Sequence, residues 1–328
     1  MKVAVANLSQ VYNLGAERIA HYHEALGDQV FLWRGSRPGQ EFPLLYLWER
    51  KPDKLYLSVI FTWELPHCAR VANLARSLGV EVEIGGPAAT VMTDWVHQQT
   101  GIRPHTGLDT RFENLPGDFE ATFTSRGCPN RCAWCLVSQL EGNHITEYPD
   151  FPLSPFISDS NILASSFEHQ VRVVDRLKPL GPVDINSGFD VRRFTPEHFD
   201  LYRRLDLKFW RFAFDTLSVE EDVERSLGIL RRGGVRNHRV IIVYILAGFG
   251  KDTPETARYR AHRVIGLEGS PYIMAYRPLD SLNRTHVPEG WSREDMERLV
   301  TYFNVPRVWR SVSFERFSRT YKADAQGA

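Results

Sequence analysis

Three cysteines close together in the chain are the residues best placed to carry chemistry. Cys128, Cys132 and Cys135 have the spacing C-x3-C-x2-C within residues 125–137, which read SRGCPNRCAWCLV. Three thiolates on one short loop can hold three irons of a [4Fe-4S] cluster and leave the fourth iron open to a small molecule. We therefore expect these three cysteines to be metal ligands.

Zinc and disulfide bonds are the alternatives for this cysteine run. A structural zinc site usually takes four ligands arranged as two pairs, and the one other cysteine, Cys68, supplies no second pair. A disulfide framework is typical of small secreted domains, whereas this chain of 328 residues begins without a signal-peptide pattern. Cys68 falls on a predicted helix, where we expect a small buried hydrophobic residue, with a catalytic thiol or a methyl acceptor as alternatives.

Composition and charge indicate a globular protein. Hydrophobic residues make up 43% and aromatic residues 12% of the chain, enough to bury a substantial core in two domains or one extended domain. Forty basic and forty acidic residues balance, which gives no support to a broad nucleic-acid-binding face. No run approaches the roughly 18 to 20 apolar residues that span a bilayer. We expect a cytoplasmic protein without a membrane partner.

Strand and helix patterns alternate over the first hundred residues. Apolar runs typical of strands cover residues 2–7, 29–33, 54–62 and 80–84, and helical patterns cover residues 16–26 and 66–78. This alternation predicts a small parallel α/β layer with a crevice at the carboxyl ends of its strands. Turn residues dominate positions 90–120, so we expect a domain boundary near residue 115.

The second part of the chain repeats strand and then helix six times. The expected strands cover residues 121–124, 155–158, 183–185, 209–214, 239–246 and 272–276, with helices at 167–177, 196–205, 219–232 and from 253. A C-terminal helical extension follows, in which Ser292 and Asp295 have the spacing of a capping box for a helix over residues 293–303.

Polar residues follow the ends of several of these strands. They are Asp159 and Asn161, then Asn186, Asp190 and Arg192, then Asp215, and finally Gly248. Each has a plain structural alternative, since an aspartate in such a place can cap the next helix or bond local backbone groups. Because parallel strands present their carboxyl ends at one rim, the joint placement of these residues favours a functional site.

The cysteine run resembles the cluster loop of the radical S-adenosylmethionine (SAM) superfamily. The resemblance includes Trp134 before the last cysteine and Arg126-Gly127 before the first, and it extends to about Pro278. An uncharacterised bacterial and phage branch of that superfamily is the most similar group. The similar segments are DSNILA at 159–164, NSGFDVR at 186–192 and FAFD at 212–215.

This resemblance implies a fold of three parts. Residues 116–280 would form the partial (β/α)6 radical SAM barrel, and residues 281–328 the helical extension. Residues 1–115 would form a Rossmann-like domain that is similar to the cobalamin-binding domain of the superfamily, including the turn Gly85-Gly86-Pro87. The usual D-x-H-x-x-G motif is absent from residues 8–15, so the domain is degenerate and only base-off cobalamin binding stays open.

The resemblance also implies an enzyme. Its [4Fe-4S] cluster would cleave SAM reductively to a 5'-deoxyadenosyl radical, which abstracts hydrogen from an unidentified substrate. The electron would come from a donor such as flavodoxin or ferredoxin. A cobalamin-dependent radical SAM methyltransferase and a non-catalytic iron-sulfur or SAM-binding protein are the alternatives.

By the same resemblance, SAM would contact Trp134 and residues at the strand ends. Arg192 would pair with the carboxylate of SAM. Asn186 and Asp215 would bond the ribose hydroxyls or the amine, and the backbone of Gly248 would admit the adenine. The superfamily's Gly-Gly-Glu motif is absent, and Asp159 is the expected substitute.

Overall fold

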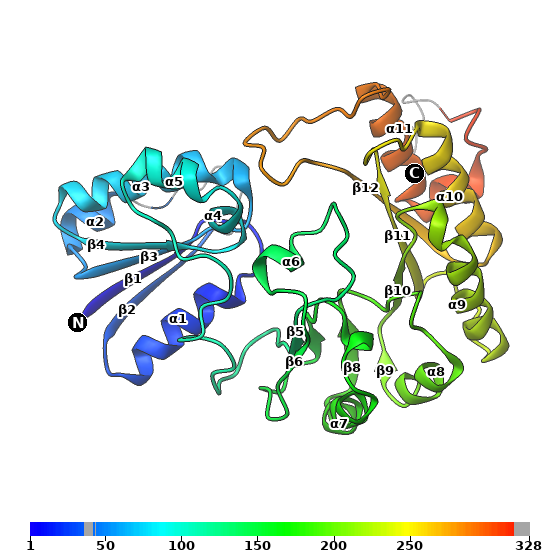
Figure 1. Ribbon diagram of the computed structural model, residues 1–328, viewed down its shortest axis with the longest axis horizontal. Coiled ribbons are helices and arrows are strands. Elements are labelled where there is room, and N and C mark those ends of the chain that lie inside the picture. Colours follow the sequence, from blue (N-terminus) through cyan, green and yellow to red (C-terminus); the bar gives the residue numbers. More distant parts are fainter. Residues whose placement is uncertain (36–41, 43, 318–328) are drawn as a thin grey trace. The chain divides into compact units, whose positions relative to one another are not determined.

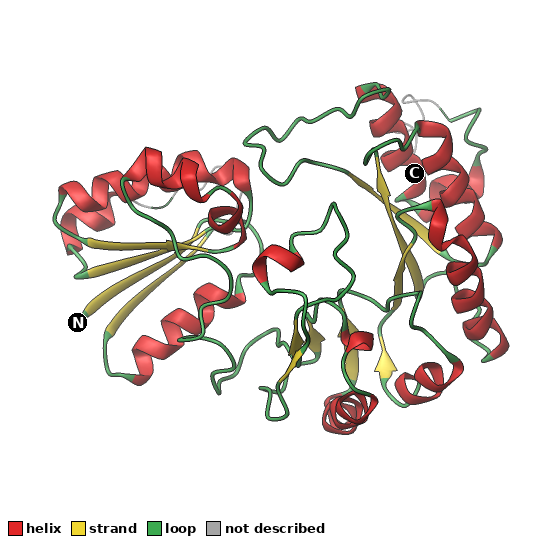
Figure 2. Cartoon of the chain, in the orientation of Figure 1, coloured by secondary structure: helices red, strands yellow, loops and turns green. Residues whose placement is uncertain are grey.

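The computed structural model describes residues 1–35, 42 and 44–317, and the chain divides into two compact units. The first unit contains Met1–Ser154 and Pro278–Arg284, and the second contains Pro155–Arg277 and Thr285–Ala328, of which residues 318–328 lie outside the described part. Each unit combines helices with parallel strands (Figures 1 and 2), which confirms the mixed α/β class. The domain limits proposed from the sequence stay a prediction.

A four-stranded parallel sheet forms the centre of the first unit. Its strands are β1 (Lys2–Asn7), β2 (Gln29–Arg34), β3 (Lys54–Ser58) and β4 (Glu81–Gly85), in the order β2-β1-β3-β4. The helices around it are α1 (Leu14–Ala25), α2 (Leu44–Arg50), α3 (Leu65–Ser77), α4 (Pro87–Val91) and α5 (Thr93–Thr100). Helix α1 covers one face of the sheet and α3 covers the other (Figure 1).

Alternating side chains of β1 explain why helices cover both faces of this sheet. Val3 and Val5 pack with Ala16 and Ala20 of α1, whereas Ala4, on the opposite face, packs with α3. Successive residues of a strand point to opposite faces, so a strand that is apolar throughout needs a cover on each side.

The turn after β4 requires glycine at position 86. Gly86 has φ +99°, and a Cβ atom there would lie 2.6 Å from the carbonyl oxygen of Val59. Glycine alone adopts this conformation without a steric cost, and it lets helix α4 begin directly after the strand.

The second unit is built on two parallel three-stranded sheets. They contain β7 (Phe156–Ile157), β8 (Pro182–Ile185) and β9 (Asp206–Leu207), and then β10 (Trp210–Ala213), β11 (Ile241–Ala247) and β12 (Ser270–Ala275), each in sequence order. The helices that separate them are α7 (Phe167–Leu177), α8 (Pro196–Tyr202), α9 (Glu220–Arg232) and α10 (Pro254–Gly266).

Arg211 connects these two sheets. Its guanidinium binds both carboxylate oxygens of Asp184 in β8, at 2.9 and 2.7 Å, and its carbonyl oxygen accepts a 2.7 Å hydrogen bond from the N–H of Phe189. Arg211 belongs to β10, so the strand that carries it lies beside β8.

The chain after β12 forms α11 (Arg293–Phe303) and α12 (Pro306–Ser311). Ser292 accepts a hydrogen bond from the N–H of Asp295, and Asp295 accepts one from the N–H of Ser292, which confirms the capping box predicted for α11. The part of the expected extension beyond residue 317 lies outside the described residues.

The segment that leads into the cysteines differs from the prediction. Residues 121–124 contain only a single bridge residue, Thr122, and no strand of a parallel sheet. Instead β5 (Ser125–Arg126) pairs antiparallel with β6 (Thr146–Glu147), and a short helix α6 (Val137–Leu140) lies between them. The long-range partner at residues 146–147 is invisible to a local apolar pattern, which is why the sequence did not predict this pairing.

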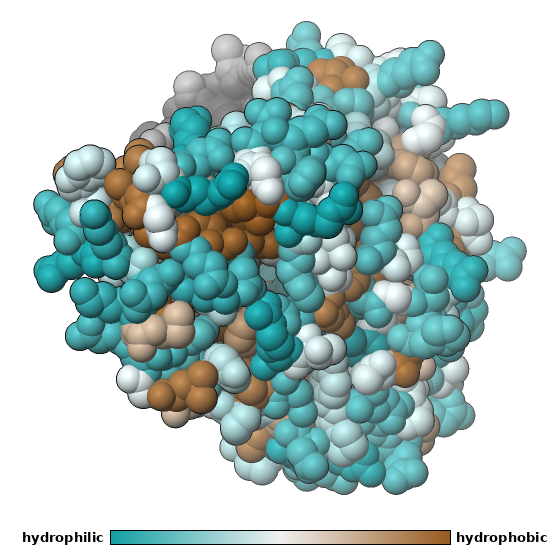
Figure 3. All heavy atoms as spheres, turned by 60° about the vertical axis from the view of Figure 1, so that its left-hand side comes forward, coloured by the Kyte–Doolittle hydropathy of each residue, from teal (hydrophilic) through white to brown (hydrophobic). Residues whose placement is uncertain are grey.

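Hydrophilic residues dominate the face shown in Figure 3, and hydrophobic residues gather there in a few brown patches. Among the exposed apolar side chains of the first unit, Leu45 and Trp48 of α2 are 72% and 64% exposed. In the part of the chain that the structure describes, no helix is long and apolar enough to cross a membrane.

Candidate functional site

The three clustered cysteines lie in the first unit, in the loop between β5 and α6. Each of them is partly buried, and the N–H of Cys135 donates a 3.0 Å hydrogen bond to the carbonyl oxygen of Cys132, which makes a tight turn. Gly127, at the start of the loop, has φ +93°, and a Cβ atom there would lie 2.0 Å from the carbonyl oxygen of His144. The loop therefore needs glycine at this position.

A buried network of charges supports this loop. Arg126 binds Glu113 at 2.9 Å and Glu141 at 2.9 Å, and Glu141 also accepts a 2.8 Å hydrogen bond from the N–H of Gly127. Arg18 of α1 lies 3.2 Å from Glu113, an ion pair whose angles are not those of a hydrogen bond. Burial lowers the pKa of Arg18, and Glu113 opposes that shift. Two acids thus compensate two buried arginines.

Burial is also the first cause of the raised pKa of the Cys135 thiol, and the nearby Cys132 and Cys128 add to it. Among the described residues, no group of three or more His, Cys, Asp or Glu side chains could hold a metal ion.

In the second unit, Asn161, Asp190 and Arg192 are brought together at the ends of β7 and β8. The side-chain amide of Asn161 donates to Asp190 at 3.0 Å, and the Nε of Arg192 donates to the other oxygen of Asp190 at 2.7 Å. Arg193 lies 3.8 Å from the same carboxylate. The side chain of Asp190 is 5% exposed and that of Arg192 is 43% exposed, so a buried acid orients an accessible arginine.

Asp159 and Asn186 follow the same two strands. Asp159 is 2% exposed, and its charge contributes, after burial, to the raised pKa of Tyr202 in α8. The N–H of Asn186 donates a 2.9 Å hydrogen bond to the carbonyl oxygen of Ile157. Asn186 thereby continues the pairing of β7 and β8 to the rim.

Asp215 and Gly248 lie at the ends of β10 and β11. One carboxylate oxygen of Asp215 accepts a 2.9 Å hydrogen bond from the N–H of Leu246 in β11, a structural role that differs from the helix cap considered as its alternative. Gly248 has φ +88°, and a Cβ atom there would lie 2.3 Å from the ring of Pro288. The ring of Pro288 therefore occupies the space that a side chain at position 248 would need.

Arg260 of α10 organises this part of the rim, and it was not among the residues predicted from the sequence. Its guanidinium donates to the carbonyl oxygens of Phe214 (2.8 Å), Asp215 (2.7 Å) and Leu246 (3.0 Å). It also pairs with Asp252 at 2.8 Å, although its side chain is only 1% exposed. The available signal was its spacing from Ala257, Ala261 and Val264, which places it on the buried face of the helix.

The predicted site residues thus fall into two groups, one in each unit. Trp134 belongs to the cysteine loop of the first unit, where it is partly buried, and the seven polar or glycine positions at the strand ends belong to the second. No finding tests the metal-ligand roles of the three cysteines or the cofactor roles of the other residues, and those roles stay predictions. The same holds for SAM, cobalamin and the electron donor.

Cys68 lies in the core of the first unit, as expected. It is 1% exposed within α3, and burial raises the pKa of its thiol to about 12. A thiol in such surroundings is protonated at neutral pH and is a poor nucleophile.

Cys68 should therefore resist alkylation in the folded protein. At pH 8 we expect iodoacetamide to modify the three loop cysteines, which are partly exposed, much faster than Cys68. Peptide mass spectrometry over a time course measures each rate, and alkylation in urea is the control in which all four react. Equal rates in the folded protein would contradict the buried position of Cys68.

Comparison with known proteins identifies no family for this chain. No family model matches it, and no curated protein matches it. The matching solved structures include the periplasmic binding protein component of the arabinose ABC transporter from Shewanella sp. ANA-3, bound to α- and β-L-arabinofuranose. The match has 9% identity and a TM-score of 0.25, and covers 97% of this chain and 99% of that one. A likeness at this TM-score carries no argument about fold or function.

The radical SAM prediction is wrong on these findings. The superfamily requires a metal cluster, but the described residues contain no group that could hold a metal ion, and no family model matches. Three expected functions depended on that assignment and are wrong with it. They are reductive cleavage of SAM, cobalamin-dependent radical methyl transfer and the non-catalytic iron-sulfur or SAM-binding role. The physical reason is that a spacing of three cysteines fixes their separation along the chain but neither their ionisation nor the direction of their side chains.

Proposed function

We propose that the protein is an enzyme that binds a small anionic molecule at the carboxyl ends of the parallel strands of its second unit. The main support for this proposal is that Arg192 and Arg193 both lie beside the buried carboxylate of Asp190. We also propose that strands β7 to β12 form part of a (β/α) barrel, because helices separate most of the strands and the sequence order is kept in both sheets. In such barrels the loops after the strands bind the ligand.

Two arginines at this rim offer donors to an anion. The guanidinium groups of Arg192 and Arg193 lie 2.7 and 3.8 Å from the carboxylate of Asp190. Planar guanidinium groups bind carboxylates and phosphates in a geometry that a lysine cannot reproduce. Asp190 accepts a hydrogen bond from the Nε of Arg192 and another from the side-chain amide of Asn161. These bonds orient the arginine before a ligand binds.

Acid-base chemistry is the reaction type that the neighbouring groups support. Asp159 is buried after β7, and Asp215 follows β10 at the carboxyl ends of the strands. Carboxyl groups enclosed at the ends of such strands are suited to moving a proton. We propose this role for the rim as a whole and assign no catalytic residue.

Binding of anions to Arg192 variants tests the proposal. Thermal-shift screening of phosphate, phosphate monoesters and small carboxylates would find a ligand, and calorimetry would measure its dissociation constant. Arg192→Ala should weaken binding by about 10- to 100-fold, because a hydrogen bond to a charged group contributes about 1.5 to 3 kcal/mol. The affinity of Arg192→Lys should lie between those of the unchanged protein and Arg192→Ala, because lysine keeps the charge but lacks the planar guanidinium.

The matched control is Arg203→Ala. Arg203 follows helix α8, its side chain is 53% exposed, and it lies near Asp200 rather than at the rim. This variant should bind the anion as the unchanged protein does. Failure of every anion in the screen to bind, or equal binding by Arg192→Ala, would refute the proposal.

A further inference from the structure

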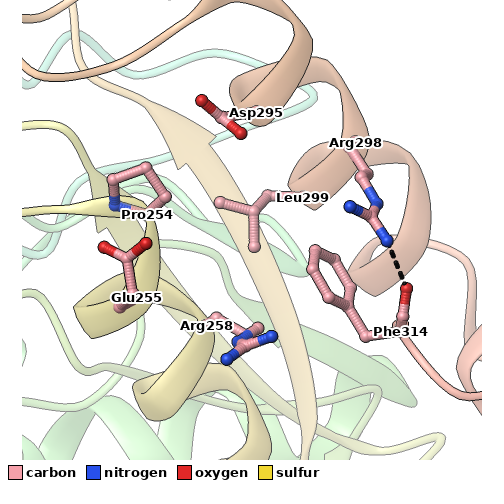
Figure 4. A pocket seen from close by; sticks show the side chains of 7 residues that line it. All are labelled: Pro254, Glu255, Arg258, Asp295, Arg298, Leu299 and Phe314. Carbon is pink, nitrogen blue, oxygen red and sulfur yellow. Dashed lines mark hydrogen bonds between the residues drawn. The ribbon is translucent and has the colours of Figure 1, made fainter.

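A cavity in the second unit is lined by other residues than those of the rim. It is bounded by the start of α10, by α11 and by Phe314, and its volume is about 180 Å³ (Figure 4). Its apolar lining residues are Pro254, Leu299 and Phe314, and its other four lining residues are charged. A cavity of this size, open to solvent, has room for a small organic molecule.

Two arginines supply a positive side to the cavity. The guanidinium carbons of Arg298 and Arg258 lie 4.4 and 5.4 Å from the centroid of the Phe314 ring. Arg298 donates to the carbonyl oxygen of Phe314 at 2.7 Å, but its buried Nε has no hydrogen-bond partner among the described residues. That atom is closed to solvent, but Arg298 as a whole is half-buried and lines the cavity, so its outer guanidinium nitrogens can donate to a ligand carboxylate.

Arg258 is held weakly and can turn to a ligand. Its one ion pair in the described residues is with Glu315 at 3.5 Å, and the two side chains are 40% and 70% exposed. Exposed pairs of this kind contribute little to stability. Exchange of Glu315 for a ligand carboxylate would therefore cost little.

Two carboxylates supply a negative side. Asp295 and Glu255 both line the cavity, and Figure 4 shows Leu299 between Asp295 and the Phe314 ring. One oxygen of Asp295 accepts both hydrogen bonds from Ser292, which holds the carboxylate in place. Glu255 is an exposed residue in the first turn of α10. The lining thus contains two positive and two negative groups beside its apolar residues.

We infer that this cavity binds the zwitterion of a small α-amino acid with an aliphatic side chain. The ligand carboxylate pairs with Arg298 and Arg258, the ammonium group pairs with Asp295 and Glu255, and the side chain contacts Leu299 and Phe314. A zwitterion matches both charged sides of this lining, whereas a simple anion or cation matches only one of them. None of these residues belongs to the anion site proposed at the strand ends.

Calorimetry on the full chain with three matched compounds tests this inference. L-Leucine carries both charged groups, 4-methylpentanoate lacks the ammonium group, and 3-methylbutan-1-amine lacks the carboxylate. We expect saturable binding of leucine and binding at least about tenfold weaker for each analogue. Absence of saturable leucine binding, or equal affinity for either analogue, would overturn the inference.

Variants of the lining give a second readout. Glu255→Gln and Arg298→Leu should each raise the dissociation constant of leucine by at least about tenfold. Their controls are Glu294→Gln and Arg293→Leu, exposed positions on α11 that do not line the cavity, and these should leave it unchanged. Because Arg298 also supports Phe314, circular dichroism must show each variant folded. A folded Glu255→Gln protein that binds leucine normally would overturn the ammonium contact.

Discussion

Replacing Arg260 with methionine should lower the free energy of unfolding of the second unit by about 3–5 kcal/mol. Arg260 is 1% exposed and donates to three carbonyl oxygens at the ends of β10 and β11. Methionine fills a similar volume but donates nothing, so these oxygens and the carboxylate of Asp252 lose a buried partner. Urea unfolding followed by circular dichroism measures the change.

Arg263→Met is the matched control for this prediction. Arg263 lies on the same helix and pairs with Glu224 and Glu220, but its side chain is 38% exposed. Solvent screens such a pair, so the control should lose less than about 1 kcal/mol. If both variants lost equally little, the hydrogen bonds of Arg260 to the strand ends would not stabilise the unit as the structure implies.

Strong local patterns explain how much of the fold could be predicted. Strands such as Lys2–Asn7 and Ile241–Ala247 are short apolar runs bounded by turn residues, and helix Phe167–Leu177 has its apolar residues at helical spacing. These features depend on neighbouring residues in the chain. The alternation of strands and helices then predicted the parallel sheets, because parallel strands need a crossover between them.

Features that depend on distant partners could not be predicted in this way. The pairing of β5 with β6 joins Ser125 to Glu147 and Arg126 to Thr146 through two-residue strands, which are too short for a pattern. The role of Arg260 depends on carbonyl oxygens of two other strands, and an arginine in a helix is ordinarily a surface residue. At the rim, the sequence did place Asn161, Asp190 and Arg192 at the carboxyl ends of β7 and β8, but the bonds among them required the structure.

The cysteine run shows the limit of motif spacing. Cys128, Cys132 and Cys135 have a spacing that suits a metal cluster, and the surrounding segments strengthened that interpretation. Among the described residues, however, no group of three or more His, Cys, Asp or Glu side chains could hold a metal ion, and the radical SAM interpretation is wrong for that reason. Spacing constrains where ligands can be along the chain, whereas binding depends on side-chain direction and ionisation.

Glu113→Gln should lower the free energy of unfolding of the first unit by about 3–5 kcal/mol. Glu113 lies 3.2 Å from Arg18 and 2.9 Å from Arg126, whose side chains are only 2% and 9% exposed. Burial already lowers the pKa of Arg18, and Glu113 is the acid that opposes the shift. A neutral glutamine leaves two buried guanidinium groups with Glu141 as the one remaining acid of the network, so a positive charge stays uncompensated away from water. Urea unfolding measures the loss.

The variant Glu83→Gln in the same unit distinguishes the contribution of burial to the free energy of unfolding from that of charge pairing. Glu83 also bridges two cations, Lys54 at 2.6 Å and Arg111 at 2.7 Å, but the Arg111 side chain is 47% exposed. We expect Glu83→Gln to lower the free energy of unfolding by about 1 kcal/mol or less. This loss should become smaller in high salt, because salt screens exposed ion pairs. The loss in Glu113→Gln should change little with salt, because its partners are buried. Equal losses with equal salt dependence would show that the Arg18–Glu113–Arg126 network is open to water, and would remove the reason to regard it as the support of the cysteine loop.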